Sequence, residues 1–463
     1  MLTLMTNRGM QRREFLTLGA LGLGGLALPS LLAARSRAAE SPGLVTGRSV
    51  IFLFLQGGPS QFETFDPKPE LPDSMRTVTD VTNTSVPGVQ FGAKLPQLAQ
   101  LAHKFAIVRS FQTNNGGHNI QPIVSPASLN ANIGCLYSRV VGATRPESGM
   151  PTNSVVFADA VDSTVLKGKA RGDISATGSL GAVHAPFIPG AGGQLQRNMR
   201  LNLPAERLAE RTELLARFDS LAQQIEAANE FQALDHLQKQ AYRVLLSGGV
   251  ADALDLTKED PATLAHYDTT DYARADGWSK TNRGQKGMYS GYAKALGKQL
   301  LLARRLCEAG CGYVTIHAGY DGVWDWHADG NNLNSRDGSE ACIPPFDHAV
   351  AAFIEDCEAR GLRDKILLVA TGEMGRTPKL NTRGGRDHWA KLAPLLLYGG
   401  GFAGGQVIGH STRDGGEPES GAVDPRHLIS TILRSLFNAG QLRLEPAFSA
   451  VSRLAEHPAI PLA

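Results

Sequence analysis

An α/β fold, with a mostly parallel sheet covered by helices on both faces, is the fold class that this sequence predicts. Several continuous apolar runs, such as residues 366–370, have the character of strands that are buried on both faces. In the C-terminal half these runs alternate with segments whose apolar residues recur at helical spacing, a pattern that favours parallel strands joined by helices. We therefore predict one α/β domain over residues 40–463, without internal repeats.

The composition excludes several classes of protein. The chain has 463 residues and a formal net charge of +2, so it is long enough to bury a large core and carries no charge excess. We therefore expect neither a nucleic acid nor a membrane surface as a partner. The five cysteines are an odd number, widely scattered and without a C-x-x-C pair, which argues against a disulfide framework and a zinc knuckle.

The beginning of the chain has the pattern of an export signal. Arg12 and Arg13 precede an apolar, glycine-rich stretch at residues 16–32, and small residues up to Ala39 form a cleavage zone. A membrane anchor is the alternative, but the apolar stretch is shorter than the about 20 residues that span a bilayer. We predict a twin-arginine signal peptide over residues 1–39, a periplasmic or secreted protein, and no stable membrane span after cleavage. Because this route carries folded proteins, commonly with a metal or cofactor in place, it favours a cofactor-dependent protein.

The N-terminal half contains three apolar runs that predict strands, and the first of them is the central one. It opens directly into the glycines at positions 57 and 58, as expected where a strand presents a site. Residues 159–197 are rich in glycine and small residues and are predicted to be loops. The predicted elements are strands at 48–55, 105–110 and 154–158, a helix at 95–103, and amphipathic helices at 204–224 and 226–246.

The C-terminal half alternates between predicted helices and strands. Residues 399–404 match G-x-G-x-x-G, but a predicted strand follows where a dinucleotide site requires a helix, so we predict a glycine-rich hairpin instead. Neither a G-x-S-x-G elbow nor a P-loop occurs, which argues against a common serine hydrolase and a P-loop nucleotide hydrolase. The predicted elements are helices at 292–309, 344–360 and 425–437, and strands at 313–317, 366–370 and 392–398.

Four of the predicted strand exits carry side chains of the kinds that bind metal ions. In open α/β sheets ligands bind in the loops at the carboxyl ends of strands, so these side chains are expected to approach one another. A divalent ion needs three or more oxygen or imidazole donors from different elements. Polar structural loops are the alternative for each residue taken singly. The candidates are Glu63, Asp66, His118, Asp325, His327, Asp329, Glu373, Asp387 and His388.

Several of these segments also carry longer motifs. They are Gly57-Gly-Pro-Ser with Thr64-Phe-Asp-Pro, the turn Trp324-Asp-Trp-His327, residues 371–378, and Gly385-Arg-Asp-His-Trp389. Together they resemble the exported bacterial family catalogued as domain of unknown function 1501, over essentially the whole mature chain. That family is similar in turn to the alkaline phosphatase and sulfatase superfamily. The resemblance implies an alkaline-phosphatase-like, sulfatase-like fold whose strand-end loops hold one or two divalent metals beside a nucleophile.

The resemblance also implies which residues bind the metal, which would be zinc, calcium, magnesium or manganese. The sequence departs from the superfamily at Gln56, where the first strand usually ends in a metal-binding aspartate. It departs again at Met374, which replaces a histidine. The implied metal ligands are Asp66, Asp325, His327, Glu373 and His388.

For the catalytic residues the resemblance leaves several alternatives open. The nucleophile is expected after the second strand, with Ser110, Thr113 and the turn ending at His118 as alternatives, so that Thr113 and His118 are candidate catalytic residues. Arg376 or Arg109 is expected to offset charge on the transferred group.

The sequence as a whole predicts an exported, metal-dependent hydrolase of phosphate or sulfate esters. Its substrate would be a small-molecule or polysaccharide ester. No C-x-P-x-R or S-x-P-x-R segment occurs from which formylglycine could be made, so an ordinary formylglycine sulfatase is not expected. The alternative is a non-catalytic exported binding or assembly protein that retains the fold, which Gln56 and Met374 favour.

Overall fold

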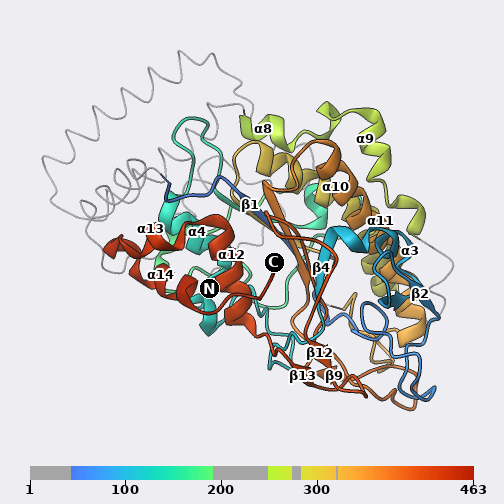
Figure 1. Ribbon diagram of the computed structural model, residues 1–463. Helices are drawn as coiled ribbons and strands as arrows, with labels where there is room; N and C mark the ends of the chain where they lie inside the picture. Colours follow the sequence, from blue (N-terminus) through green and yellow to red (C-terminus); the bar gives the residue numbers. More distant parts are fainter. Residues whose placement is uncertain (1–42, 191–248, 274–282, 320–321) are drawn as a thin grey trace, which may run out of the picture.

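The computed structural model describes residues 43–190, 249–273, 283–319 and 322–463. The predicted signal at residues 1–39 and the two helices predicted within 204–246 lie outside these ranges. In the described chain a seven-stranded sheet lies between helices (Figure 1).

The central sheet is mostly parallel, as predicted. Its strand order is β11-β4-β10-β7-β1-β6-β5. Strand β10 is antiparallel to both of its neighbours, β4 and β7, whereas the other pairs in the sheet are parallel. The strands are β1 (Ser49–Phe54), β4 (Phe105–Val108), β5 (Asn153–Val156), β6 (Tyr313–His317), β7 (Ile366–Thr371), β10 (Leu395–Gly399) and β11 (Gln406–Ile408).

Strand β1 shows why these strands are apolar throughout. Ile51 and Leu53 belong to the core on one side of the sheet, whereas Val50, Phe52 and Phe54 belong to the core on the other side. All five side chains are fully buried. Because both faces are covered, every position along the strand favours an apolar side chain.

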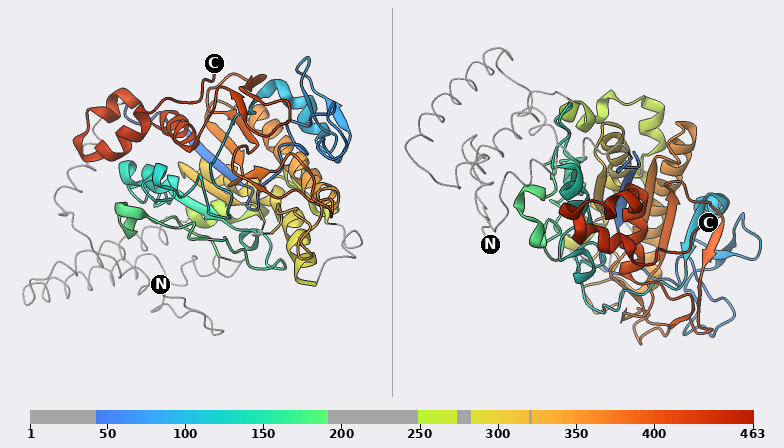
Figure 2. Two further views of the ribbon diagram at one scale, coloured as in Figure 1. Left: turned by 90° about the horizontal axis from the view of Figure 1, so that it is seen from below. Right: turned by 60° about the vertical axis from the view of Figure 1, so that its left-hand side comes forward.

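Two layers of helices cover the sheet (Figures 1 and 2). The core on one side includes residues of α3, α8, α10 and α11, and the core on the other side includes residues of α4, α12, α13 and α14. The helices are α3 (Pro96–Leu101), α4 (Ile133–Val141), α8 (Gly249–Leu254), α9 (Pro261–His266), α10 (Arg283–Glu308), α11 (Ser335–Ala359), α12 (Pro425–Leu436), α13 (Ala439–Arg443) and α14 (Ser449–Glu456).

Helix α11 begins well before the predicted start at Pro344. Asn334 is its N-cap, and the Asn334 side chain accepts a hydrogen bond from the backbone N–H of Asp337 at 2.8 Å. Pro344 and Pro345 therefore lie inside the helix. Proline is favoured at the first position of a helix, which is why the pattern placed the start there. The long buried face of α11 stabilises the helix despite the two missing N–H donors.

The glycine-rich segment at 399–404 is not the predicted hairpin. Strands β10 and β11 do not pair with each other, because β4 lies between them and pairs with both. Gly399, Gly400 and Gly401 have positive φ angles of 78°, 63° and 84°, which allow the chain to reverse and pass the end of β4. A pattern of apolar runs and glycines does not distinguish adjacent strands from strands with another strand between them.

The direction of the strands determines where their exits lie. Strands β1, β4, β6 and β7 run in one direction, so their carboxyl ends lie at the same edge of the sheet.

The chain also forms three short two-stranded ribbons outside the main sheet, within the described ranges. They are β2 (Val81–Asn83) with β3 (Gln90–Gly92), β8 (Gly375–Arg376) with β9 (His388–Trp389), and β12 (His410–Ser411) with β13 (Pro418–Ser420).

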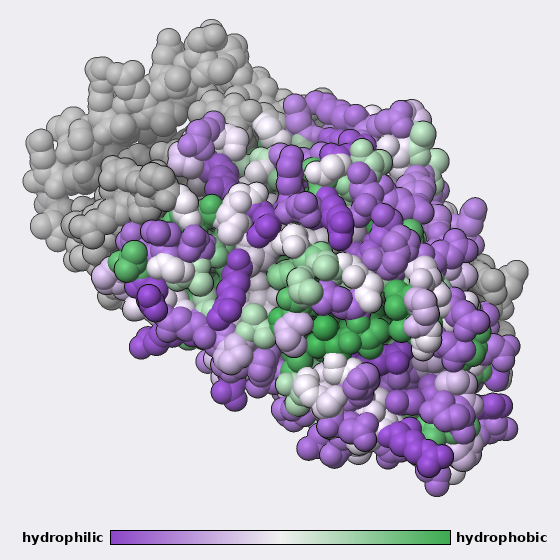
Figure 3. All heavy atoms as spheres, in the orientation of Figure 1, coloured by the Kyte–Doolittle hydropathy of each residue, from purple (hydrophilic) through white to green (hydrophobic). Residues whose placement is uncertain are grey.

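The face drawn in Figure 3 is mostly hydrophilic, with a hydrophobic area near its centre. Among the described residues, the large hydrophobic side chains that are exposed are scattered singly, at Leu166, Ile188 and Leu444. No helix in the described ranges is both long enough and apolar enough to cross a membrane.

Candidate metal centre

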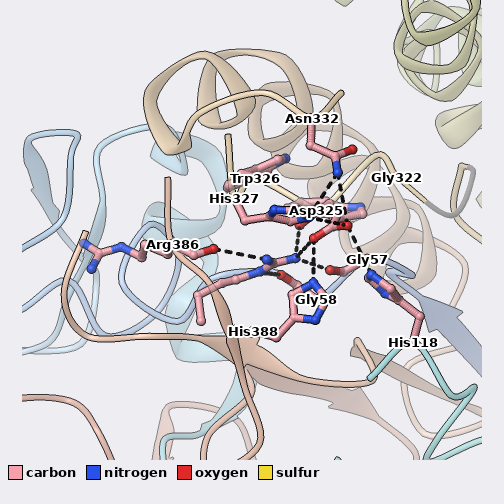
Figure 4. A network of polar contacts seen from close by, with 12 residues as sticks. Gly57, Gly58, His118, Gly322, Asp325, Trp326, His327, Asn332, Arg386 and His388 are labelled. Carbon is pink, nitrogen blue, oxygen red and sulfur yellow. Dashed lines mark hydrogen bonds and ion pairs between the residues drawn. The ribbon is translucent and has the colours of Figure 1, made fainter. Parts of the chain in front are cut away.

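The carboxylate of Asp325 is the meeting point of three histidine side chains (Figure 4). Its Oδ2 atom lies 3.1 Å from Nε2 of His118 and 3.1 Å from Nε2 of His327. Its Oδ1 atom lies 3.1 Å from Nε2 of His388. The ring centroids of His327 and His388 are 5.2 Å apart, and those of His118 and His388 are 4.6 Å apart. These four residues are called the Asp325 cluster below.

The cluster is assembled from distant parts of the sequence by the edge of the sheet. His118 follows β4, and both Asp325 and His327 follow β6. His388 lies on β9, and the register of the β8 and β9 ribbon places it opposite Arg376, shortly after β7. The carboxyl ends of β4, β6 and β7 lie at one edge, so these exits meet there, as predicted.

The hydrogen bonds of His388 show that the cluster fits a metal ion. Nδ1 of His388 lies 3.1 Å from the carbonyl oxygen of Gly116, an atom that only accepts, so Nδ1 carries the proton in the neutral ring. The lone pair on Nε2 then faces Oδ1 of Asp325, which is also an acceptor. A second proton, or a metal ion that binds both atoms, removes this opposition. Imidazole nitrogen and carboxylate oxygen are ligands of divalent ions, so the donor set suits such an ion.

His118 has the same arrangement, with a second carboxylate behind it. Its Nδ1 atom lies 2.9 Å from Oε1 of Glu373, while its Nε2 atom faces Asp325. Burial alone would lower the pKa of His118, but hydrogen bonds to Asp325 and Glu373 raise it to about 9. Histidine ligands of metals usually bond through their second nitrogen to a carboxylate or carbonyl in this way.

Glu373, predicted as a metal ligand, is thus found behind His118. It is fully buried, and its carboxylate also accepts the N–H of Gly57 at 2.9 Å and 3.1 Å. Among the described residues, its carboxylate contacts His118 and Gly57 and forms no hydrogen bond with His327 or His388. Its position is that of a residue that orients His118.

Asp325 is ionised by its surroundings. Burial alone would raise the pKa of Asp325, but hydrogen bonds to the three histidines and the charge of Arg376 hold it well below its usual range. Nη2 of Arg376 lies 2.7 Å from Oδ1 of Asp325. The guanidinium of Arg376 is buried among protein acceptors, and its contact within the cluster is with Asp325.

Two predicted site residues lie outside the Asp325 cluster. Oδ2 of Asp66 accepts a hydrogen bond from Ser411, and its Oδ1 lies 3.5 Å from Nζ of Lys68 and 3.7 Å from Nε of Arg109. The negative charge of Asp66 is therefore compensated by Lys68 and Arg109. Thr113 is buried, and its hydroxyl lies 3.4 Å from the backbone oxygen and nitrogen of Asn115. Among the described contacts, neither Asp66 nor Thr113 touches the cluster.

The remaining acids named from the sequence have separate partners. Glu63 and Arg386 are both fully buried and form an ion pair at 3.2 Å. Asp329 borders the cluster, with its Oδ2 atom 3.8 Å from Nε2 of His327. Asp387 accepts a hydrogen bond from Asn381 at 3.0 Å and is exposed.

Gln56 has a structural role at the end of β1. Its side chain donates to the carbonyl of Arg171 at 3.2 Å and accepts the N–H of Arg171 at 2.9 Å. Its Oε1 atom also lies 2.8 Å from Nε2 of His317. Gln56 thus binds a neighbouring loop.

Asn332 and two backbone groups belong to the site but were not predicted. Nδ2 of Asn332 lies 3.3 Å from Oδ2 of Asp325 and 3.1 Å from Nε2 of His327. The N–H of Gly57 and the carbonyl of Gly116 fix Glu373 and His388. The glycines at the strand exits were the only sequence signal for these backbone contacts.

One side of the cluster faces solvent. The side chains of His327 and His388 are 21% and 29% exposed, whereas those of His118 and Asp325 are 9% and 5% exposed. A molecule from solvent would therefore reach the cluster past His327 and His388.

The sheet and this cluster define an α/β protein with a candidate metal centre at the carboxyl edge of its strands. The chain belongs to the family described as "Protein of unknown function (DUF1501)", whose sequence profile matches residues 47–441. No curated protein matches the chain.

Solved structures with a similar chain path include hydrolases. A PsFucS1 sulfatase from Pseudoalteromonas sp. has 12% identity and a TM-score of 0.34, covering 89% of this chain and 72% of the sulfatase chain. The phosphonate monoester hydrolase SpPMH from Silicibacter pomeroyi has 12% identity and a TM-score of 0.31, covering 84% and 73% of the two chains. An alkaline phosphatase from the Antarctic bacterium TAB5 has 14% identity and a TM-score of 0.28, covering 77% and 92%.

Proposed function

We propose that this protein is an exported, metal-dependent hydrolase of phosphate or sulfate esters. The observation that carries the proposal is the convergence of three imidazole nitrogens on the carboxylate of Asp325. Two of the three rings, those of His118 and His388, have their other nitrogen bonded to an acceptor, which directs Nε2 toward the centre. The motif resemblance described above supports the reaction class.

The donor set favours zinc among the four ions expected. Imidazole nitrogen suits zinc and other transition ions, whereas calcium and magnesium prefer sites made of oxygens alone. Asp325, His118, His327 and His388 would hold the ion. When bound, the ion supplies Lewis acidity that polarises the ester and makes phosphorus or sulfur easier to attack.

The chain's own residues set the geometry of the reaction. Glu373 orients His118, and the carbonyl of Gly116 orients His388. His327 and His388 border the side from which an ester would approach. Within the described ranges, no hydroxyl or thiol side chain hydrogen-bonds to the cluster, so we propose water as the nucleophile in place of Thr113.

The test is metal analysis of protein purified without chelators, followed by hydrolysis of chromogenic phosphate and sulfate esters. We expect bound zinc and measurable turnover in the wild type. His388→Ala should lower metal affinity by at least about 10-fold, because it removes a ligand, and should abolish turnover. His410→Ala, at an exposed position on β12, is the matched control and should behave as wild type. Absence of a bound ion, together with turnover that does not depend on His388, would overturn the proposal.

A non-catalytic metal-binding protein is the second candidate, and a specific observation favours it. The buried cations Arg376 and Arg386 donate to protein acceptors, so neither is free to bind the anionic group of an ester. A protein that binds one ion through His388 but hydrolyses neither class of ester would support this candidate.

A further inference from the structure

The guanidinium of Arg376 lies in a cage made of protein oxygens. The side chain is 1% exposed, and five oxygen atoms surround its nitrogens. The carboxylate oxygen is Oδ1 of Asp325, at 2.7 Å from Nη2. The other four are the backbone carbonyls of Gly57, Gly58, Trp324 and Arg386.

This set of acceptors is of the kind that binds a hard cation. Calcium and similar ions take carboxylate and backbone carbonyl oxygens from several segments. In this protein the guanidinium of Arg376 is the cation that these oxygens surround. The backbone at Gly58 is shaped for it, because a Cβ at this position would lie 3.2 Å from Nη2 of Arg376 and 2.6 Å from Cγ of Met374. The cage and the guanidinium therefore fit each other closely.

Asp325 is shared between this cage and the histidines. Its Oδ2 atom faces His118 and His327, whereas its Oδ1 atom faces both His388 and Arg376. A carboxylate with a cation on one side and ligand nitrogens on the other has the position of a group that bridges two cations.

We propose that Arg376 is a built-in cation that takes the place of a second metal ion, so that the centre binds a single divalent ion. The proposal rests on the proposed function for that one ion. Arg376 is in this view a positioning residue, which holds Asp325 toward the histidines and contributes a permanent positive charge. It does not contact substrate.

The test counts ions by elemental analysis in the full chain after equilibration with zinc. The count is taken as the difference between the wild type and the triple variant His118→Ala, His327→Ala, His388→Ala. A second described group of ligand-type side chains, at Asp424, His427 and His457, is intact in both proteins, so any ion bound there cancels. We expect a difference of one ion per chain.

The other outcomes separate this inference from the proposed function. A difference of two ions would overturn the single-ion inference while leaving a metal-dependent hydrolase in place. A difference of zero would overturn both. Cobalt substitution adds a spectroscopic check, because nitrogen ligands from three histidines shift its visible absorption, and the triple variant should lack that band.

A second variant tests the guanidinium itself. Arg376→Ala should free the oxygen cage, so that the folded variant takes up one additional ion from millimolar calcium, whereas Arg376→Lys should not. Circular dichroism establishes whether each variant is folded, and the wild-type count stands on its own if the alanine variant is not. A folded Arg376→Ala protein that takes up no calcium would overturn the claim that the guanidinium occupies an ion's place.

Discussion

Asp325 accepts contacts on both carboxylate oxygens, and each oxygen serves a different set of donors. Oδ2 faces His118, His327 and Asn332, whereas Oδ1 faces His388 and Arg376. A buried carboxylate is costly unless its charge is compensated, and here the compensation comes from four titratable or charged side chains. Each of these side chains therefore helps to hold Asp325 in its ionised form.

His317 provides a test at the residue scale, because it is buried and, among the described residues, its ring bonds to the neutral side chain of Gln56. Burial lowers its pKa to about 4, from a usual value of 6.5. Between these pH values the unfolded chain binds a proton that the folded chain excludes, so the free energy of unfolding decreases as pH falls. We expect a loss on the order of 3 kcal/mol from this residue between neutral pH and pH 4.

The measurement is chemical denaturation at several pH values between 7.5 and 4.5. His317→Gln removes the titrating group, and its amide can still donate to Gln56, so its stability should fall less steeply than that of the wild type. His410→Gln removes an exposed histidine and is the control. Equal pH dependence in the wild type and in His317→Gln would contradict the prediction.

The types of residue in the Asp325 cluster could be predicted from the sequence. Which residues would bind the ion directly, and which would bond to a ligand and orient it, could not. Asp325, His327 and His388 were named as ligands, and His118 as a catalytic residue, from their places after strands. The sequence does not distinguish Glu373, which bonds to Nδ1 of His118, from a direct ligand, because both lie just beyond a strand. Such differences of one side-chain length depend on how the loops pack.

The segment that follows β1 packs against the loop that carries Asp325. Gly57 is the residue at this contact. Gly57 has a φ of +125°, and a Cβ there would lie 2.8 Å from the backbone nitrogen of Trp324 and 2.9 Å from that of Asp325. Both contacts are with backbone, so neither can be relieved by a side-chain rotation.

We expect Gly57→Ala to displace the loop that carries Asp325 and to reduce metal content. The matched control is Gly330→Ala, where φ is +104° but no atom lies within 4 Å of the added Cβ. Both variants strain the backbone, but Gly57→Ala adds overpacking, which costs about 1–3 kcal/mol more. Chemical denaturation and elemental analysis of both variants measure the difference. Equal losses in the two would argue against close packing at this exit.

Elements differed in how well their sequence predicted them. Strand β6 was predicted with its observed bounds, because it is a short run rich in β-branched and aromatic residues after a glycine. Helix α4 was not predicted, since its buried face includes Gly134 and polar residues such as Ser138. The first turns of α11 carry Asn334 and charged residues, whose helical state depends on capping and on burial against the sheet.

For the whole molecule, the parallel order of the strands was the prediction that mattered most for the site. Helical segments between apolar runs predict parallel strands, and parallel strands bring their exits together. The reversed β10, and β4 between β10 and β11, were not predictable from periodicity, which carries no information about strand order.

Export is the remaining prediction at the scale of the molecule. Arg12→Lys combined with Arg13→Lys should leave the precursor in the cytoplasm, because twin-arginine export requires the arginine pair. Cell fractionation of a bacterium that expresses each precursor, followed by immunoblotting, measures the distribution. Arg8→Lys, which lies outside the pair, is the control. Unchanged export of the double variant would remove the twin-arginine assignment.

The reversed direction of β10 has a consequence for how such proteins diversify. Strand β7 ends, and β10 begins, at the same edge of the sheet, so residues 372–394 leave and re-enter the fold on one side. This excursion carries Glu373, Arg376 and His388. Insertions or deletions within it would reshape the approach to the centre without changing the register of either strand. Family members are therefore expected to differ in ligand preference through the length of this segment, while the sheet beneath it stays the same.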